Sequence, residues 1–223
     1  MNKIKASYEI LTPISEGGIK ELQHIEKIGR VCYKSEDYIT EDGESARKFV
    51  AMLIRNGHEA MIEHSFLSVK FTVDRGVSHE LVRHRIASFA QESTRYCNYA
   101  KDKFGAECAF IDLEPGIILD NKMKKMSGEE IALVMAEWTS AMEDAERHYM
   151  RLLELGATPQ IARAVLPNST KTEITVSANY REWRNFFKLR VPADVHPQMR
   201  EVTIPLLREL KGMIPVIFDD IEC

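Results

Sequence analysis

Long apolar runs and paired cysteines are missing from this sequence. No apolar stretch approaches the ~20 residues that a membrane-spanning helix requires, and the opening Met-Asn-Lys-Ile-Lys-Ala lacks the apolar core of a signal peptide. The four cysteines are scattered and include no Cys-x-x-Cys pair (Cys32, Cys97, Cys108 and Cys223). This spacing argues against a disulfide framework or a zinc site. We therefore expect a cytoplasmic protein with reduced thiols and no membrane partner.

An excess of basic charge is also missing. Lysine and arginine number 30 against 34 acidic residues, so the formal net charge is -4 at pH 7. Because general affinity for nucleic acid usually needs a basic face, we expect no nucleic-acid partner. The 223 residues contain no internal repeat and no linker-like run. A chain of this length can bury a sizeable core, and we expect a single domain over residues 1–223.

Hydrophobic periodicity predicts an α+β fold. Alternation of apolar and polar residues predicts strands over residues 4–11, 67–73, 107–113 and 172–176. Helical spacing and capping signals predict helices over about 19–28, 44–56, 77–85, 127–155, 159–166 and 179–189, and from 197 onward, with a loop over 87–93. The long helix at about 127–155 starts with the capping-box residues Ser127 and Glu130. Its expected buried stripe is Ile131, Val134, Trp138, Ala141, Ala145 and Leu152. We expect a central, mostly antiparallel sheet flanked by these helices.

The densest cluster of positive charge is Arg83-His84-Arg85, which is followed after seven residues by Ser93 and then by Arg95. Arginine presents five N–H donors in a planar fork that matches phosphate oxygens. Because the chain as a whole is acidic, such focused charge favours a nucleotide-sized ligand over a polyanion. The alternative is a solvated helix end, where arginine and histidine also interact favourably with the helix dipole.

A second polar cluster follows the last predicted strand. It consists of Asn179, Arg181, Arg184, Asn185, Lys188 and Arg190. Side-chain amides supply both donors and acceptors, and they therefore suit the edge of a nucleobase or a flavin. The alternative is an ordinary solvated helix face, with Arg184 and Lys188 on its wet side.

Arg163 stands among apolar neighbours in Ala162-Arg163-Ala164-Val165-Leu166-Pro167. A buried and unpaired guanidinium would be strongly unfavourable, so this setting indicates a bound ligand or an internal salt bridge. Upstream, two histidines and two carboxylates occur in Gly57-His58-Glu59 and Glu63-His64. Their spacing is not that of a helical His-Glu-x-x-His zinc site, and we expect no metal.

Taken in order, these segments resemble the flavin-dependent thymidylate synthases. The resemblance begins with Gly57-His58-Glu59 and Glu63-His64 and centres on Arg83-His84-Arg85 followed by seven residues and Ser93. It includes Ile86-Ala87-Ser88, Ser93-Thr94-Arg95-Tyr96, the segment 162–167, Asn179-Tyr180-Arg181, Asn185 and Leu189-Arg190. Four ordered blocks from residue 57 to residue 190 make this a specific match.

The resemblance implies an enzyme that makes dTMP from dUMP, with FAD as cofactor and methylenetetrahydrofolate and NADPH as co-substrates. It also implies a homotetramer with sites at subunit interfaces. The implied FAD contacts are His58, Arg83, His84, Arg85, Gln91, Asn179, Arg181 and Asn185. The implied dUMP contacts are Glu80, Arg83, Gln91, Glu92, Ser93, Thr94, Arg95, Arg163 and Arg190. Some relatives carry a carboxylate where this chain has Gln91, which as a neutral amide still forms hydrogen bonds.

Arg190 is the implied catalytic residue. C5 of the uracil must become a nucleophile, and no cysteine here lies in a Pro-Cys setting that would suit addition to C6. A fixed guanidinium can instead stabilise the negative charge that develops over N3 and O2 as C5 attacks. Ser93 has no histidine obviously placed as its base, so we expect it to bind substrate.

Two other interpretations are open on the residues alone. The arginine clusters could serve a non-catalytic nucleotide- or RNA-binding module, whose affinity would fall steeply with salt. They could also belong to a phosphohydrolase in which His84 handles phosphate, although a second dedicated histidine is not evident.

Overall fold

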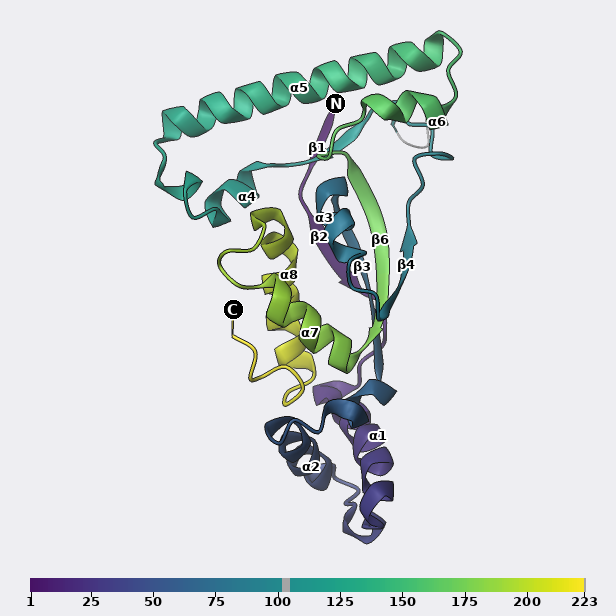
Figure 1. Ribbon diagram of the computed structural model, residues 1–223, viewed down its shortest axis with the longest axis vertical. Helices are drawn as coiled ribbons and strands as arrows, with labels where there is room; N and C mark the ends of the chain where they lie inside the picture. The colour runs from purple at the N-terminus through teal and green to yellow at the C-terminus, as the bar shows by residue number, and fades with distance from the viewer. Residues whose placement is uncertain (102–104, 223) are drawn as a thin grey trace.

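A four-stranded antiparallel sheet forms the centre of the chain (Figure 1). The computed structural model describes residues 1–101 and 105–222. The strands lie in the order β2 (Ser7–Ile10), β3 (Phe66–Asp74), β6 (Lys171–Asn179) and β4 (Ala87–Gln91). The predicted α+β class and antiparallel sheet are thus confirmed.

Strand alternation determines which face of the sheet is buried. On β3 the alternate residues Leu67, Val69, Phe71 and Val73 are fully buried, whereas Ser68, Lys70 and Thr72 are only partly covered. Alternating β-sheet residues point to opposite faces, so the apolar set packs under α7 (Tyr180–Arg190) and α8 (Pro197–Met213). The main core therefore lies between the sheet and these two helices. α7 also contacts the turn that carries Arg83-His84-Arg85.

The predicted strand over 4–11 is found at residues 7–10, but its first residue, Ile4, belongs to a separate strand. β1 (Asn2–Ile4) pairs in parallel with β5 (Ala109–Ile111), whereas β2 pairs with β3 in the central sheet. The change of partner falls between Ile4 and Ser7, where the chain passes from one sheet to the other. Alternation alone could not reveal this change, because both segments alternate in the same way.

The predicted loop over 87–93 is wrong, because its first part forms the edge strand β4. Ala87 to Gln91 pair with β6 from Ala178 to Ile174. The helix before it, α3 (Arg75–Leu81), starts earlier than predicted because the Asp74 side chain caps it by accepting from the Val77 N–H at 2.6 Å. It also ends earlier, so residues 83–85 lie in the turn between α3 and β4 and not on the helix.

The remaining helices lie at the two ends of the sheet. At one end α1 (Ile19–Arg30) packs against α2 (Glu44–Arg55), both as predicted. At the other end α5 (Gly128–Glu154) crosses above the N-terminus, close to the short helix α6 (Pro159–Ala162) and the turn η7 (Arg163–Val165) (Figure 1). The short α4 (Glu114–Leu119), which the sequence did not predict, packs on α8.

The predicted start of α5 is confirmed, because Ser127 and Glu130 form a full capping box. None of the six residues of its predicted buried stripe is fully buried, although all except Ala141 are partly covered. Met142 and Tyr149 are the buried residues of α5, whereas Ala141 is exposed and Leu133 is 72% exposed. Much of the apolar surface of α5 is therefore uncovered in a single chain. No helix in residues 1–101 and 105–222 is long and apolar enough to cross a membrane.

Candidate active site

Two adjoining hollows of about 490 and 640 Å³ lie between α7 and the turn that follows α3. They share Ile86, Glu182 and Asn185, and we call the pair the α7 groove. The first is also lined by Glu59, Glu63, Asn179, Arg181 and Lys188, and the second by Val82, Arg83, His84, Arg85, Leu189 and Arg190. The groove has the size of a small-molecule or cofactor site.

The start of α7 fixes one wall of the groove. Asn179, the last residue of β6, caps α7 by accepting a hydrogen bond from the Glu182 N–H at 2.8 Å. Residues three and four apart on a helix share a face, so Glu182 and Asn185 lie side by side along the groove. Arg181 projects outward and pairs with Glu63 at 2.5 Å. The predicted cap and the predicted grouping of Asn179, Arg181 and Asn185 are both found.

His84 is buried beside the groove, between the carboxylate of Glu182 and the guanidinium of Arg190. Its Nδ1 lies 3.0 Å from Oε1 of Glu182, and its Nε2 accepts from Nε of Arg190 at 3.1 Å. Because Nε2 acts as an acceptor, the proton of neutral His84 must be on Nδ1, which donates to Glu182. Burial lowers the pKa of His84; Glu182 opposes this shift, and the positive charge of Arg190 adds to it. His84 therefore acts as a neutral positioning group.

Arg190 is held from two further directions by Glu80. Its Nη1 donates to Oε2 of Glu80 at 2.8 Å, and its Nη2 donates to the Glu80 carbonyl oxygen at 3.2 Å. Oε1 of Glu80 in turn lies 2.8 Å from Nδ1 of His196. Three of the five guanidinium N–H donors are thus engaged by residues that the structure describes, which leaves two for a ligand.

Arg83 and Arg85 differ from Arg190 because their guanidinium groups are unpaired. Both side chains are exposed, and neither has an ion-pair partner among residues 1–101 and 105–222. They flank the buried His84 at the mouth of the groove. Two adjacent guanidinium groups without a protein anion form a suitable site for phosphate oxygens.

The residues expected to bind dUMP are divided between two places. Arg83 and Arg190 line the α7 groove, and Glu80 contacts Arg190. The segment from Glu92 to Arg95 instead lies beyond the opposite end of β4, close to α6 and η7. There the Arg163 Nη1 donates to Oγ1 of Thr94 at 3.1 Å, and the Arg95 Nε donates to Gln160 at 3.1 Å. A single chain does not bring these two groups together.

Internal partners already hold Gln91 and Glu92. The Gln91 amide donates to Oγ of Ser78 at 2.9 Å and to Thr172 at 3.2 Å. Glu92 pairs with Lys171 at 2.9 Å. Both side chains therefore fix the end of β4, and Gln91 has no contact with the groove in a single chain.

His58 also lies outside the α7 groove. It lines a separate hollow with Cys32, Tyr33 and Met61, although the next residue, Glu59, reaches into the groove. Within one chain, His58 therefore does not line the α7 groove with the other residues expected to bind FAD.

The structure gives two arginines surroundings that the sequence did not indicate. Arg163 is exposed, not buried among apolar groups, because η7 turns its side chain outward toward Thr94. Arg184, which the alternative interpretation placed on the wet side of its helix, is only 1% exposed, and Glu59 and Asp220 pair with it there.

The acidic residues that line the groove were not among the predicted ligand contacts (Glu59, Glu63 and Glu182). Glu182 stands three residues after the cap Asn179, a spacing that could have drawn attention to it. Glu59 belongs to the Gly57-His58-Glu59 motif, but its place in the groove depends on tertiary packing that no local pattern indicates. Within the described ranges, no group of three or more histidine, cysteine, aspartate or glutamate side chains could hold a metal ion.

Comparison with known proteins gives a consistent result. A family model described as thymidylate synthase complementing protein matches residues 19–216. The chain is 32% identical over 212 residues to the flavin-dependent thymidylate synthase of Corynebacterium aurimucosum. The aligned region covers 93% of this chain and 82% of that protein. It is 30% identical over 203 residues to the protein of the same name from Mycobacterium tuberculosis strain H37Rv, which covers 89% and 78%.

A solved structure shares the fold. The crystal structure of the UMP/dUMP methylase PolB from Streptomyces cacaoi, bound with 5-Br dUMP, superimposes with a TM-score of 0.80. The match covers 98% of this chain and 96% of that chain at 24% sequence identity. At this identity the similarity shows a common architecture, which agrees with the sheet and helices described above.

Proposed function

The chain belongs to the flavin-dependent thymidylate synthase family, and we propose that it methylates dUMP to dTMP with FAD as its cofactor. In this proposal methylenetetrahydrofolate supplies the carbon and NADPH supplies the electrons. When bound, FAD carries the redox part of the reaction, which no side chain can perform. The predicted alternatives of an RNA-binding module and a phosphohydrolase have no supporting observation.

The observation that carries the proposal is the pair of unpaired guanidinium groups of Arg83 and Arg85 beside the amides of Asn179 and Asn185. The arginines suit the diphosphate of FAD, and the amides suit polar atoms of its ring or sugar. With hollows of about 490 and 640 Å³ joined along α7, the groove has room for a dinucleotide. We assign Arg83, His84, Arg85, Asn179, Arg181 and Asn185 to FAD binding.

Arg190 is the proposed catalytic residue. His84 and Glu80 fix its guanidinium from two sides, and two N–H donors remain for the substrate. A positive group held in advance of the reaction stabilises negative charge on N3 and O2 of the uracil without reorganising. Since arginine stays protonated, this stabilisation persists across the physiological pH range.

The buried thiol of Cys108 supports a mechanism without a cysteine nucleophile. Burial raises its pKa to about 12, so the thiolate is scarce near neutral pH. Cys32 lies in the hollow beside His58, away from Arg190. Neither thiol is placed to add to C6 of a uracil that lies against Arg190.

We propose that a second copy of the chain completes the dUMP site. In this arrangement the remaining contacts, Gln91 to Arg95 and Arg163, reach dUMP bound at the α7 groove of another subunit. Their distance from the α7 groove within one chain supports this arrangement, as does the uncovered apolar surface of α5. A homotetramer would bring the two groups from different subunits together and could also place His58 near the flavin. We further propose that residues 1–223 form one domain and that the enzyme is cytoplasmic.

A spectroscopic experiment tests this proposal. The purified chain should bind FAD and turn yellow, and NADPH should bleach the flavin absorbance when dUMP is present. A colourless protein that neither binds added FAD nor consumes NADPH would contradict it.

A further inference from the structure

The C-terminal segment 214–222 folds back against α7 on the side away from the sheet (Figure 1). Ile217, Phe218 and Ile221 are almost fully buried, and the Phe218 ring packs against Phe187 with ring centroids 5.6 Å apart. The segment is therefore part of the core, even though it follows the last helix.

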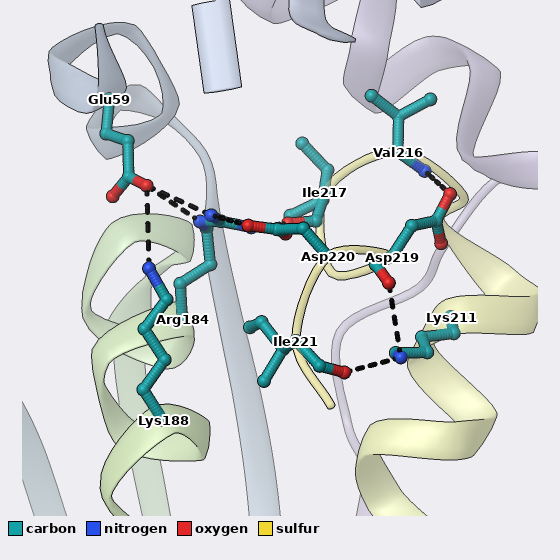
Figure 2. Close-up of polar contacts among 9 residues, drawn as sticks. All are labelled: Glu59, Arg184, Lys188, Lys211, Val216, Ile217, Asp219, Asp220 and Ile221. Atoms are coloured by element: carbon teal, nitrogen blue, oxygen red, sulfur yellow. Dashed lines mark hydrogen bonds and ion pairs between the residues drawn. The ribbon is translucent and has the colours of Figure 1, made fainter. Parts of the chain in front are cut away.

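Polar contacts fix the path of this segment (Figure 2). The Val216 N–H donates to Oδ2 of Asp219 at 2.8 Å, and the Lys211 Nζ donates to the carbonyl oxygen of Ile221 at 2.5 Å. Val216 has a φ of 84°, a conformation that is rare for a β-branched residue and persists only where the surroundings impose it. These contacts hold the neighbouring Asp220 in one place.

Arg184 joins this segment to the α7 groove, and Figure 2 shows its side chain between Glu59 and Asp220. Its Nη1 and Nη2 donate to the two carboxylate oxygens of Asp220 at 2.6 and 2.8 Å. On the other side, its Nε and Nη2 lie 3.1 and 3.0 Å from Oε1 of Glu59. Nη1 also donates to the carbonyl oxygen of Ile217. Four of its N–H donors are thus hydrogen-bonded and two carboxylates lie within ion-pair distance, which compensates the cost of burying the guanidinium.

Glu59 lines the groove, and its carboxylate is only partly engaged by Arg184. Its Oε1 receives both contacts from Arg184 and lies 3.9 Å from the Lys188 Nζ. Its Oε2 has no hydrogen-bond partner in the described part of the chain, and Glu59 lines the same hollow as Asn179 and Asn185. An oriented carboxylate oxygen with a vacant lone pair accepts hydrogen bonds from hydroxyl or N–H groups of a ligand.

We infer that Asp220 is a positioning residue that, through Arg184, holds Glu59 as an acceptor for a hydroxyl or N–H group of the flavin. The inference rests on the proposed function, because it takes the α7 groove as the flavin site. Without the Asp220 carboxylate, Arg184 loses two of its contacts and can shift away from Glu59. The C-terminal segment then influences cofactor affinity without touching the cofactor.

The test measures the Kd for FAD by titration of flavin fluorescence, together with the melting temperature. D220N should raise the Kd about tenfold, the effect expected for losing one charge-assisted hydrogen bond. E222Q is the matched control: it removes an acidic charge two residues away, from an exposed side chain that takes no part in these contacts, and it should leave the Kd within about twofold. D220E should restore most of the affinity because it restores the carboxylate.

A double-mutant cycle separates positioning from general loosening of the fold. E59Q alone should raise the Kd, and adding D220N to E59Q should change it by less than about twofold. Equal effects of D220N in both backgrounds, or wild-type affinity in D220N, would overturn the inference. If D220N does not fold, wild-type affinity in E59Q would overturn it as well. Absence of FAD binding by the wild-type chain would instead contradict the proposed function.

Discussion

Arg190 donates its Nε–H to Nε2 of His84 across 3.1 Å, although both side chains can carry positive charge. The contact requires a neutral His84 whose proton is on Nδ1. This N–H donates a hydrogen bond to Oε1 of Glu182 across 3.0 Å. Burial of the imidazole lowers its pKa and so favours the neutral form. The orientation of the proposed catalytic arginine therefore depends on the protonation state of a neighbouring histidine.

This dependence predicts an acidic limb in the pH–rate profile. As pH falls through the lowered pKa of His84, Nε2 gains a proton, can no longer accept from Arg190, and repels it. Turnover should fall with an apparent pKa below the ordinary histidine value of ~6.5. Glu182 raises the pKa of His84, so Glu182→Gln should move the acidic limb to still lower pH. A limb that moves to higher pH in this variant would contradict the assigned network.

Arg190→Ala should reduce turnover strongly while leaving FAD bound. Loss of one electrostatic stabiliser of a transition-state charge typically lowers kcat by about 10²- to 10³-fold. Arg190→Lys should recover little, because an ammonium group cannot keep the contacts with His84 and Glu80 and still offer two donors. The exposed Arg208 provides a control, since Arg208→Ala removes equal charge outside the groove. Wild-type kcat in Arg190→Ala would refute the catalytic role.

Ser93→Ala should retain measurable turnover with a raised KM for dUMP. Within the chain, Ser93 Oγ accepts from the Arg95 N–H at 3.3 Å, and no histidine contacts it among the described residues. A serine in this setting binds and orients substrate. Steady-state kinetics check the prediction, and complete loss of kcat with intact dUMP binding would instead indicate a nucleophile.

Glu201 predicts a pH-dependent change in stability. Burial, together with Asp112 and Asp74, raises its pKa to about 7, and its Oε2 has no hydrogen-bond partner in the described part of the chain. In the unfolded chain the pKa of a glutamate is ~4.3. The free energy of unfolding therefore decreases as the pH rises from the unfolded-state pKa to the folded-state pKa of about 7. Glu201→Gln should therefore raise the Tm at pH 8 by more than at pH 5. The exposed Glu137→Gln serves as control, and an equal Tm gain at both pH values would contradict the account.

Local signals in the sequence predicted most of the helices. Ser127 with Glu130 and the cap at Asn179 mark helix starts that depend only on nearby residues, and both were found. β4 was missed because Ala87 to Gln91 have little strand propensity and become a strand only by pairing with β6. The division at residues 4–7 was missed for the same reason, since strand partners are a tertiary property.

The candidate site was also predicted only as far as local sequence signals allow. The grouping of Arg83, His84, Asn185 and Arg190 was expected and is found in one groove. The burial of Arg184 was not expected, because its acidic partners Glu59 and Asp220 lie far from it in the sequence. The place of Ser93 relative to Arg190 depends on the assembly of chains, which no local pattern specifies.

Formation of dTMP by the purified chain tests the central claim most directly. The chain is incubated anaerobically with dUMP, methylenetetrahydrofolate and NADPH, with and without FAD, and dTMP is quantified by mass spectrometry. The account predicts dTMP that accumulates only when FAD is present, at a rate that Arg190→Ala lowers by about two orders of magnitude or more. No dTMP at saturating substrate and FAD, or equal dTMP from a flavin-free protein, would contradict it.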